Sequence, residues 1–107
     1  MDMTHTEWGY VVGGTNGTAK VVDTGKLWVK AMAFAGNADD ATATLTSDVA
    51  GTATSCYKFK SDGNDLDASG CHVFFGDRGI PFTNLTVTQS HANDRLYIFI
   101  EIGRAHV

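Results

Sequence analysis

Hydrophobic and polar residues alternate along most of the chain, and the alternation is clearest over Arg95–Ile102. One parity carries only branched aliphatic residues: Leu96, Ile98, Ile100 and Ile102. The other parity carries Arg95, Tyr97, Phe99 and Glu101. Because successive side chains of a strand point to opposite faces, a period of two gives each set its own face. The aliphatic face must be buried, so the pattern predicts a central strand with a tightly specified register.

Earlier segments carry the same two-residue period. Lys26–Phe34 is mostly apolar on both parities, with Leu27, Val29, Ala31 and Ala33 on one and Trp28, Lys30, Met32 and Phe34 on the other. Such a strand is predicted to be central, or to contact a second sheet or subunit. Ala41–Ser47 and Phe82–Thr88 alternate apolar residues with threonine or other polar residues. Both are predicted as half-buried strands, and Gly36–Asp40 as a loop.

Two pairs of segments resemble β-hairpins. Asn16-Gly17, the commonest signal for a two-residue turn, lies between Trp8–Val12 and Thr18–Val22. This arrangement predicts a hairpin with Val12 opposite Val21.

The second pair is Ser55–Lys60 and Asp67–Phe75, with Gly63-Asn64 between them. Glycine at the first central position fits a type II′ turn. Counting outward from that turn places Cys56 opposite Cys71.

Composition agrees with these strands. The chain has 107 residues, 12 glycines and a single proline, and 43% of its residues are hydrophobic. A chain of this length buries roughly 65% of its unfolded surface without needing staples. We therefore expect one all-β domain over residues 1–107, with residues 1–7 as a loose N-terminal arm. About eight short antiparallel strands indicate either a β-sandwich of the jelly-roll kind or a small barrel.

Charge and targeting signals restrict the partners. The formal net charge is −4, and the eight basic residues are scattered. Binding to a phosphate backbone requires clustered Lys and Arg, so we expect no nucleic-acid partner. No apolar run approaches the roughly 18 residues of a membrane span, so we expect no membrane partner. The N-terminus lacks a basic region followed by an apolar one, and we expect synthesis in a cytoplasm without export by that route.

The two cysteines allow two readings. The predicted register brings Cys56 and Cys71 within the reach of a disulfide. A reducing cytoplasm favours two free thiols. Oxidation at a later stage, once the protein has left a reducing cytoplasm, stays open.

A search for catalytic or metal-binding chemistry finds no complete pattern. Cys71 and His72 are neighbours on a predicted strand, so their side chains point to opposite faces and cannot form a dyad. The four histidines have no metal-ligand spacing. Asp62–Asp67 lacks the residue order of an EF-hand, and turn chemistry explains its composition. Gly13–Lys20 lacks the ending of a phosphate loop. We expect no enzyme activity, no metal and no cofactor.

Four features of the sequence together form a layout that resembles a known one. They are Leu27–Lys30, the loop 36–40 with its threonine-alternating strand, Gly79–Phe82 before Leu85–Val87, and Arg95–Ile102. In this layout the chain resembles the head decoration, or cement, proteins of tailed bacteriophages. The resemblance implies a non-enzymatic β-sandwich or barrel, often trimeric, that binds the major capsid protein lattice and stabilises the head. It also implies synthesis in the host cytoplasm and a final location on the capsid surface of the virion.

Two other functions remain open: a tail or head–tail adaptor component, and a carbohydrate-binding β-sandwich in which Trp8 and Trp28 stack on sugar. The alternation also predicts a set of outward residues that a partner would cover. This expected subunit or capsid interface consists of Trp28, Met32, Phe34, Tyr97 and Phe99. A second copy around a threefold axis is the favoured cover, and a closed barrel that hides these rings is the alternative.

Overall fold

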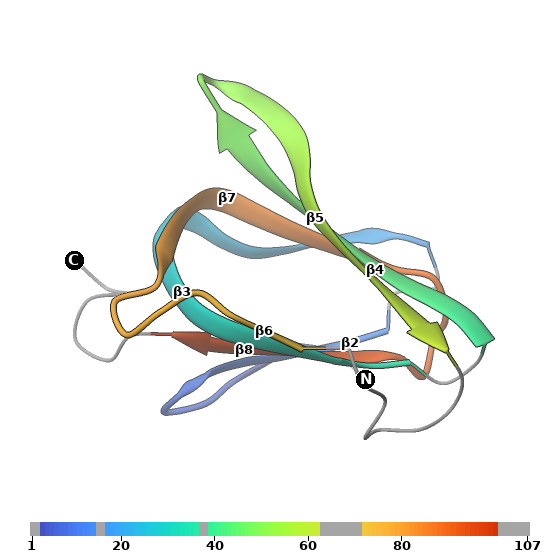
Figure 1. Cartoon of the computed structure of the whole chain (residues 1–107). Coiled ribbons are helices and arrows are strands. Elements are labelled where there is room, and N and C mark those ends of the chain that lie inside the picture. Colours follow the sequence, from blue (N-terminus) through green and yellow to red (C-terminus); the bar gives the residue numbers. More distant parts are fainter. Residues whose placement is uncertain (1–2, 15–16, 37–38, 63–71, 101–107) are drawn as a thin grey trace.

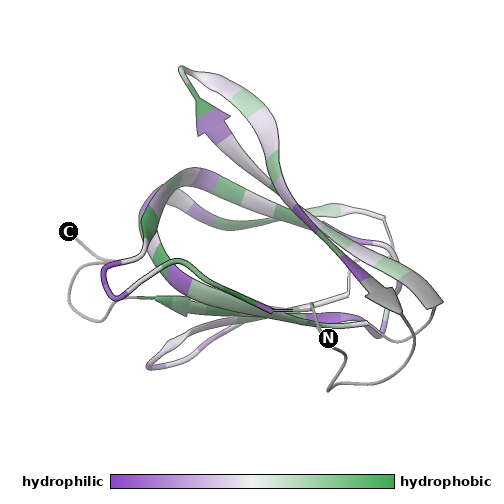
Figure 2. Cartoon of the chain, in the orientation of Figure 1, coloured by the Kyte–Doolittle hydropathy of each residue, from purple (hydrophilic) through white to green (hydrophobic). Residues whose placement is uncertain are grey.

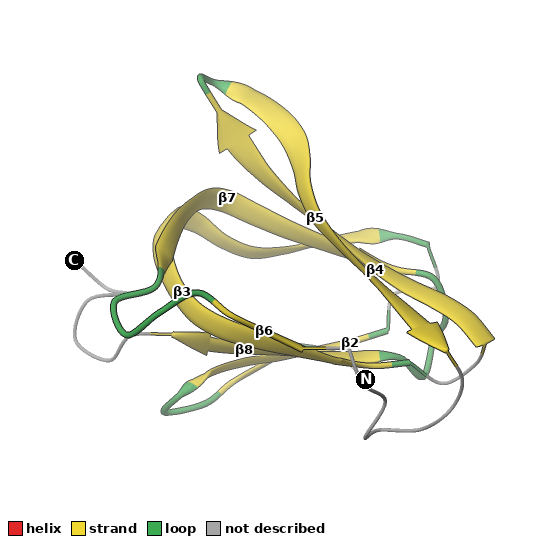
Figure 3. Cartoon of the chain, in the orientation of Figure 1, coloured by secondary structure: helices red, strands yellow, loops and turns green. Residues whose placement is uncertain are grey.

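The computed structural model describes residues 3–14, 17–36, 39–62 and 72–100. These residues form strands and connecting loops, with no helix among them (Figure 3). The strands are β1 (Thr4–His5), β2 (Gly9–Gly13), β3 (Ala19–Ala35), β4 (Asp39–Val49), β5 (Thr52–Asp62), β6 (His72–Phe74), β7 (Ile80–Gln89) and β8 (Arg95–Ile100). The predicted all-β fold with about eight antiparallel strands is confirmed.

One antiparallel sheet folds over itself into two layers. Its order is β1-β2-β8-β3-β7-β4-β5, and β6 pairs separately with β3. β3 bends from one layer to the other, with β7 beside it (Figure 1). The first part of β3 pairs with β7, and the last part pairs with β8 and β6. The result is sandwich-like.

The core lies between the two layers and follows the alternation of the strands. In β8, Leu96 and Ile98 are completely buried and Ile100 nearly so. β4 buries Ala41, Ala43 and Leu45, while its threonines remain half-exposed. Figure 2 shows the corresponding alternation of hydrophobic and hydrophilic positions along β7. β8 lies between β2 and β3, so its predicted central position is correct.

A β-bulge in β3 corrects one part of the predicted surface. Val29 pairs with Ile100 but Ala31 pairs with Phe99, so Lys30 is an extra residue. An extra residue reverses which parity faces inward. Met32 and Phe34 are therefore only 1% and 2% exposed and belong to the core. The expectation that they lie on the outer face was wrong.

The predicted hairpin at Asn16-Gly17 is also wrong. β2 pairs with β8, placing Val12 opposite Leu96, whereas Val21 in β3 lies opposite Thr86 in β7. The backbone of Gly14 approaches the β7–β8 turn so closely that an added Cβ would lie 2.0 Å from the His91 carbonyl oxygen. Glycine thus permits a contact with a distant segment that the local turn signal did not reveal.

The second predicted hairpin lies largely outside the described residues, and its described end, residues 72–75, does not pair with β5. β5 pairs with β4, so Lys58 lies opposite Thr44. β6 pairs with β3, and His72 lies opposite Ala33. Gly63-Asn64 and Cys71 lie outside the described residues.

Two boundary predictions need correction as well. Within the expected loose arm, Thr4 and His5 form β1 and pair with Val11 and Tyr10. Asp39 and Asp40 were expected in a loop but begin β4. β1 is a separate short strand that returns along β2, and β4 extends beyond its apolar pattern where Asp39 pairs with Asp62 of β5. In both places backbone pairing with a neighbour forms a strand that the apolar pattern does not mark.

Candidate functional site

The outer face of the layer formed by β2, β8, β3 and β6 carries a row of exposed rings. Registered pairs place four residues side by side across these strands: Gly9, Phe99, Ala31 and Phe74. Directly opposite residues in an antiparallel pair share a face, so both phenylalanines point outward with the small Ala31 between them. Phe74 is 64% exposed and Phe99 36% exposed.

Trp8 extends this row at the β2 end. Its ring stacks on Phe99, with 4.8 Å between ring centroids and 29° between the planes. The Trp8 carbonyl oxygen accepts a hydrogen bond from the Ile100 amide at 2.9 Å, which fixes the backbone beside the stack. Trp8 nevertheless remains 37% exposed, so the stacked pair of rings is open to solvent on one side.

A second row lies parallel to the first: Val11, Tyr97, Ala33 and His72. We call the two rows together with Trp8 the aromatic face. Ala31 and Ala33 lie between the β8 rings and the β6 rings, so small side chains leave apolar surface between the two groups of rings. Exposed aromatic residues gathered on one face are typical of binding surfaces.

Of the five residues predicted for an interface, the structure brings two together on this face, Tyr97 and Phe99. Trp28 is half-buried and lies opposite Pro81 in the β3–β7 pair, and Met32 and Phe34 are in the core. Sequence reasoning did not place Phe74 here, because it assigned Val73 and Phe75 to a different pairing. Alternation within Val73-Phe74-Phe75 was the available signal, since it sets Phe74 apart from its two neighbours.

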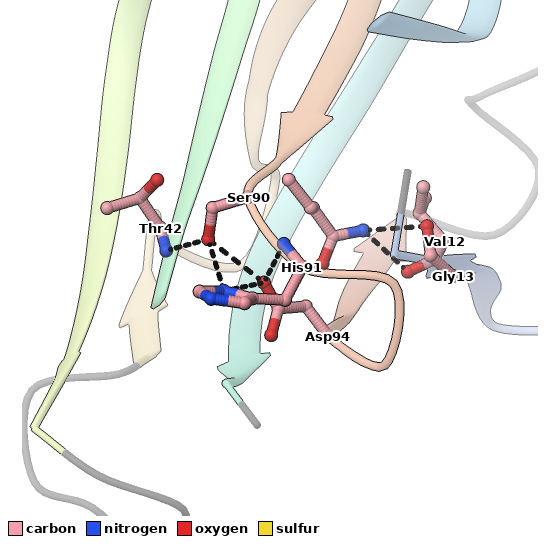
Figure 4. A network of polar contacts seen from close by, with 7 residues as sticks. Val12, Gly13, Thr42, Ser90, His91 and Asp94 are labelled. Carbon is pink, nitrogen blue, oxygen red and sulfur yellow. Dashed lines mark hydrogen bonds and ion pairs between the residues drawn. The ribbon is translucent and has the colours of Figure 1, made fainter. Parts of the chain in front are cut away.

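A polar cluster closes the turn between β7 and β8, and sequence reasoning treated this segment only as a loop (Figure 4). Asp94 is completely buried. Its Oδ2 accepts hydrogen bonds from the His91 amide at 3.0 Å and from the Ser90 hydroxyl at 3.3 Å. The Ser90 Oγ also accepts the Thr42 amide at 2.8 Å, which joins the turn to β4.

Serine, histidine and aspartate in contact invite comparison with a catalytic triad, but the geometry does not fit. In a triad the carboxylate holds one imidazole nitrogen while the other takes the serine proton. Here the Ser90 Oγ and the Asp94 Oδ2 both lie near His91 Nδ1, at 2.8 and 3.8 Å. The cluster therefore caps and anchors a turn, and it offers no proton path from serine through histidine to aspartate.

Cys56 is the cysteine that lies within the described residues. Cys56 has a free thiol that donates to the Leu45 carbonyl oxygen at 3.4 Å, and burial raises the pKa of this thiol although the residue as a whole is exposed. A thiol of raised pKa is a weak nucleophile at neutral pH. The candidate disulfide partner, Cys71, lies outside the described residues.

Pockets and metal sites add no chemistry to the described part of the chain. A shallow groove of about 380 Å³ is lined by Thr44, Ser55, Tyr57 and Lys58. The lining residues that the structure describes have hydroxyls and one amine but neither a carboxylate nor an imidazole for acid–base catalysis. Residues 3–14, 17–36, 39–62 and 72–100 contain no group of three potential metal ligands. Within the same ranges no helix is long and apolar enough to cross a membrane.

Comparison of the chain with protein-family models, with curated proteins and with solved structures found no match.

Proposed function

We propose that this chain is a non-enzymatic structural protein of a virion, which decorates the outer capsid lattice and stabilises the head. The single observation that supports this best is the aromatic face, with Phe74 and the Trp8–Phe99 stack in one row. Protein interfaces are enriched in aromatic residues and depleted of charge at their centre. The identity of the partner as a capsid lattice rests on the resemblance to head decoration proteins.

The size of the face favours a partner that presents many copies of its binding site. Four strands spaced about 4.8 Å apart and two rows of side chains cover roughly 20 by 15 Å. A standard stable interface buries about 800 Å² on each partner, well above this patch. One copy alone would therefore bind weakly. A lattice lets many weak copies act together, because whatever binds only the assembled shell shifts its equilibrium toward assembly.

A protein partner fits the face better than a sugar. Sugar binding combines ring stacking with hydrogen bonds from nearby polar groups, which fix the orientation of the ligand. The first row offers phenylalanine, alanine and glycine, which have no polar side-chain atoms, and the second row adds only the Tyr97 hydroxyl and the His72 imidazole. Carbohydrate binding is therefore the second candidate, supported by the stacked rings of Trp8 and Phe99.

Co-sedimentation with capsids tests the proposal. The probe is capsids assembled from the major capsid protein of the genome that encodes this chain. We expect the wild type to pellet with them and Phe74→Ser to bind about tenfold more weakly, as for an interface aromatic worth more than about 1 kcal/mol. Val21→Ser is the matched control, since Val21 is 49% exposed but lies opposite Thr86 in the other part of β3.

Equal binding by Phe74→Ser and the wild type would remove the aromatic face from the contact. Binding to an insoluble polysaccharide that is lost in Phe74→Ser, with no binding to capsids, would favour the sugar reading. Sedimentation of Tyr97→Ser/Phe99→Ser addresses the expected homotrimer. A folded variant that falls from trimer to monomer would assign these two rings to contacts between copies.

A further inference from the structure

A positive charge lies at one end of the aromatic face. Arg95 of β8 is opposite Gly13 of β2 and Ala35 of β3, so it begins a third row beside the two rows of rings. Its side chain is exposed, and it has the same parity along β8 as Tyr97 and Phe99. Residues of one parity share a face of the sheet, so this cation lies on the same side as the rings.

Lys30 brings a second positive charge to the same face, beside the first row. The β-bulge in β3 sets Lys30 and Ala31 opposite the single residue Phe99, and Ala31 also pairs with Phe74 of β6. A bulge changes the direction of the side chain of its extra residue. Here β8 and β6 flank Lys30 and the core lies beneath it, so its head group can reach water only on the outer side.

The ammonium group of Lys30 is available to a partner. The Lys30 side chain is half-buried, and its backbone is fixed because its carbonyl oxygen accepts the Phe75 amide at 2.6 Å. Within the described ranges no carboxylate forms an ion pair with this ammonium. A long side chain that buries its stem and keeps its charge in water presents that charge at the level of the neighbouring rings.

The charge of the aromatic face has the opposite sign to that of the whole chain. The chain has 12 acidic and eight basic residues. At the registered outward positions of β2, β8, β3 and β6, however, Lys30 and Arg95 are accompanied by glycine, valine, alanine, aromatic residues and histidine, without a carboxylate. Glu7 lies in the turn beside Trp8, and Asp77 lies in the loop after β6. The acidic side chains thus lie outside the two rows of rings.

We propose that the aromatic face recognises an acidic protein surface, in which an apolar patch covers the rings and a carboxylate pairs with Lys30. The inference rests on the proposed function and names the chemistry that the capsid surface presents to this chain. Protein interfaces bring patches of opposite potential together. The rings around Lys30 exclude water once they are covered, and an ion pair is stronger in such surroundings than in bulk water.

The same charges oppose two other occupants. A second copy docked face to face would enclose the Lys30 and Arg95 cations of both copies without a carboxylate to pair with them, and like charges at an interface cost several kcal/mol. Nucleic acid carries a negative charge at every phosphate and requires clustered cations, whereas this chain has a net charge of −4. An acidic protein needs only a few carboxylates, placed where the cations lie.

Charge reversal at Lys30 tests the proposal, with the capsids described above as the probe. We expect Lys30→Glu to bind about tenfold more weakly than the wild type, because it sets like charges against each other. Lys30→Gln, which keeps a long side chain at the bulge, should bind with intermediate affinity. Lys26→Glu is the matched control and should bind as the wild type does, since Lys26 is exposed on the same strand but lies opposite Thr83 of β7.

Salt gives a second readout that a purely structural effect of the substitution would not produce. The difference between Lys30→Glu and the wild type should shrink at about 1 M salt, where charges are screened within about 3 Å. Equal binding by Lys30→Glu and the wild type, while Phe74→Ser binds weakly, would overturn the acidic partner and leave the proposed function standing. Equal losses in Lys26→Glu and Lys30→Glu would also overturn it, because net charge alone would then explain the effect.

A resin that carries a random copolymer of glutamate and tyrosine tests the same chemistry without capsids. We expect it to retain the wild type and Lys26→Glu, and to release Lys30→Glu and Phe74→Ser earlier. Retention on the copolymer without binding to capsids would remove the proposed function but keep the acidic partner. Failure of the resin to retain the wild type would overturn the proposal. Retention on immobilised oligothymidylate instead, lost in Lys30→Glu, would overturn it in favour of nucleic acid.

Discussion

Gln89 is a completely buried glutamine at the end of β7, and its side chain joins strands that are far apart in the sequence. Its Nε2 donates to the carbonyl oxygens of Val12 and Gly13 at 2.9 and 3.0 Å. These bonds satisfy two acceptors of β2, which would be costly to bury unpaired. A polar residue at a buried position of an alternating strand can thus be part of the core, where its hydrogen bonds select one packing arrangement.

Tyr10 is a second residue whose polar end matters. Its ring lies in the core, and its hydroxyl donates to Asp23 Oδ2 at 3.3 Å. Burial, followed by the negative charge of Asp23 and this hydrogen bond, raises the pKa of Tyr10 above the usual 10.0. The unfolded chain therefore loses this proton at lower pH than the folded chain does.

We expect this linkage to appear as alkaline destabilisation. Tyr10 contributes stability that is fully present below pH 10 and is lost as the pH rises through the higher pKa of the folded state. Tyr10→Phe should cost about 1 kcal/mol at neutral pH and then flatten the pH dependence above pH 10. Urea unfolding between pH 7 and 11 measures both effects. Tyr97→Phe is the control, and an equal slope in all three proteins would rule out the linkage.

At the scale of elements, glycines decide which strands can approach one another. A Cβ added to Gly9 would lie 1.8 Å from the carbonyl oxygen of Ile98, a backbone atom that cannot move aside alone. The short β2 therefore fits against β8 only with glycine at this position. The same principle applies at Gly14 beside the β7–β8 turn.

Gly9→Ala tests this close approach. The substitution should destabilise the fold by about 1–3 kcal/mol or more, since it forces β2 away from β8. Gly25→Ala is the matched control, because a Cβ there meets only the Asp23 side chain, at 3.5 Å. Thermal unfolding of the two variants gives the comparison. Similar melting temperatures would mean that β2 can shift without loss of packing.

At the scale of the whole molecule, the aromatic face lies on one layer, formed by β2, β8, β3 and β6. The β4–β5 hairpin lies at the other end of the strand order and contributes nothing to this face. In the proposed function each copy would therefore use one layer for the shell, and binding of many copies would shift the shell toward the assembled state.

The proposed function predicts that this protein makes phage heads more stable. Heads stripped of this protein should break at lower temperature or under milder osmotic stress, and adding back the wild type should restore them. Phe74→Ser/Phe99→Ser should fail to restore them, while Val21→Ser should succeed. Equal survival of stripped and complete heads would instead favour the tail or head–tail adaptor. Breakage temperature followed by light scattering is the measurement.

The sequence by itself determined the all-β class, the central β8 and the inward faces of β4 and β8. These follow from a two-residue period, which is a local property that burial on one side of a strand imposes. Tyr97 and Phe99 were correctly placed opposite the aliphatic row for the same reason. The two-residue alternation predicted the buried face correctly wherever no bulge interrupted the strand.

Only the tertiary structure decided which strands pair and where the alternation changes phase. A single extra residue at Lys30 turned Met32 and Phe34 from surface to core, and nothing in Lys26–Phe34 marks that position. Asn16-Gly17 signalled a local hairpin, yet β2 and β3 pair with distant strands. Strand pairing is a long-range choice settled by total burial, close approach at Gly9 and Gly14, and the hydrogen bonds of Gln89. A local pattern cannot contain that information, because every alternating strand could pair equally well with several others.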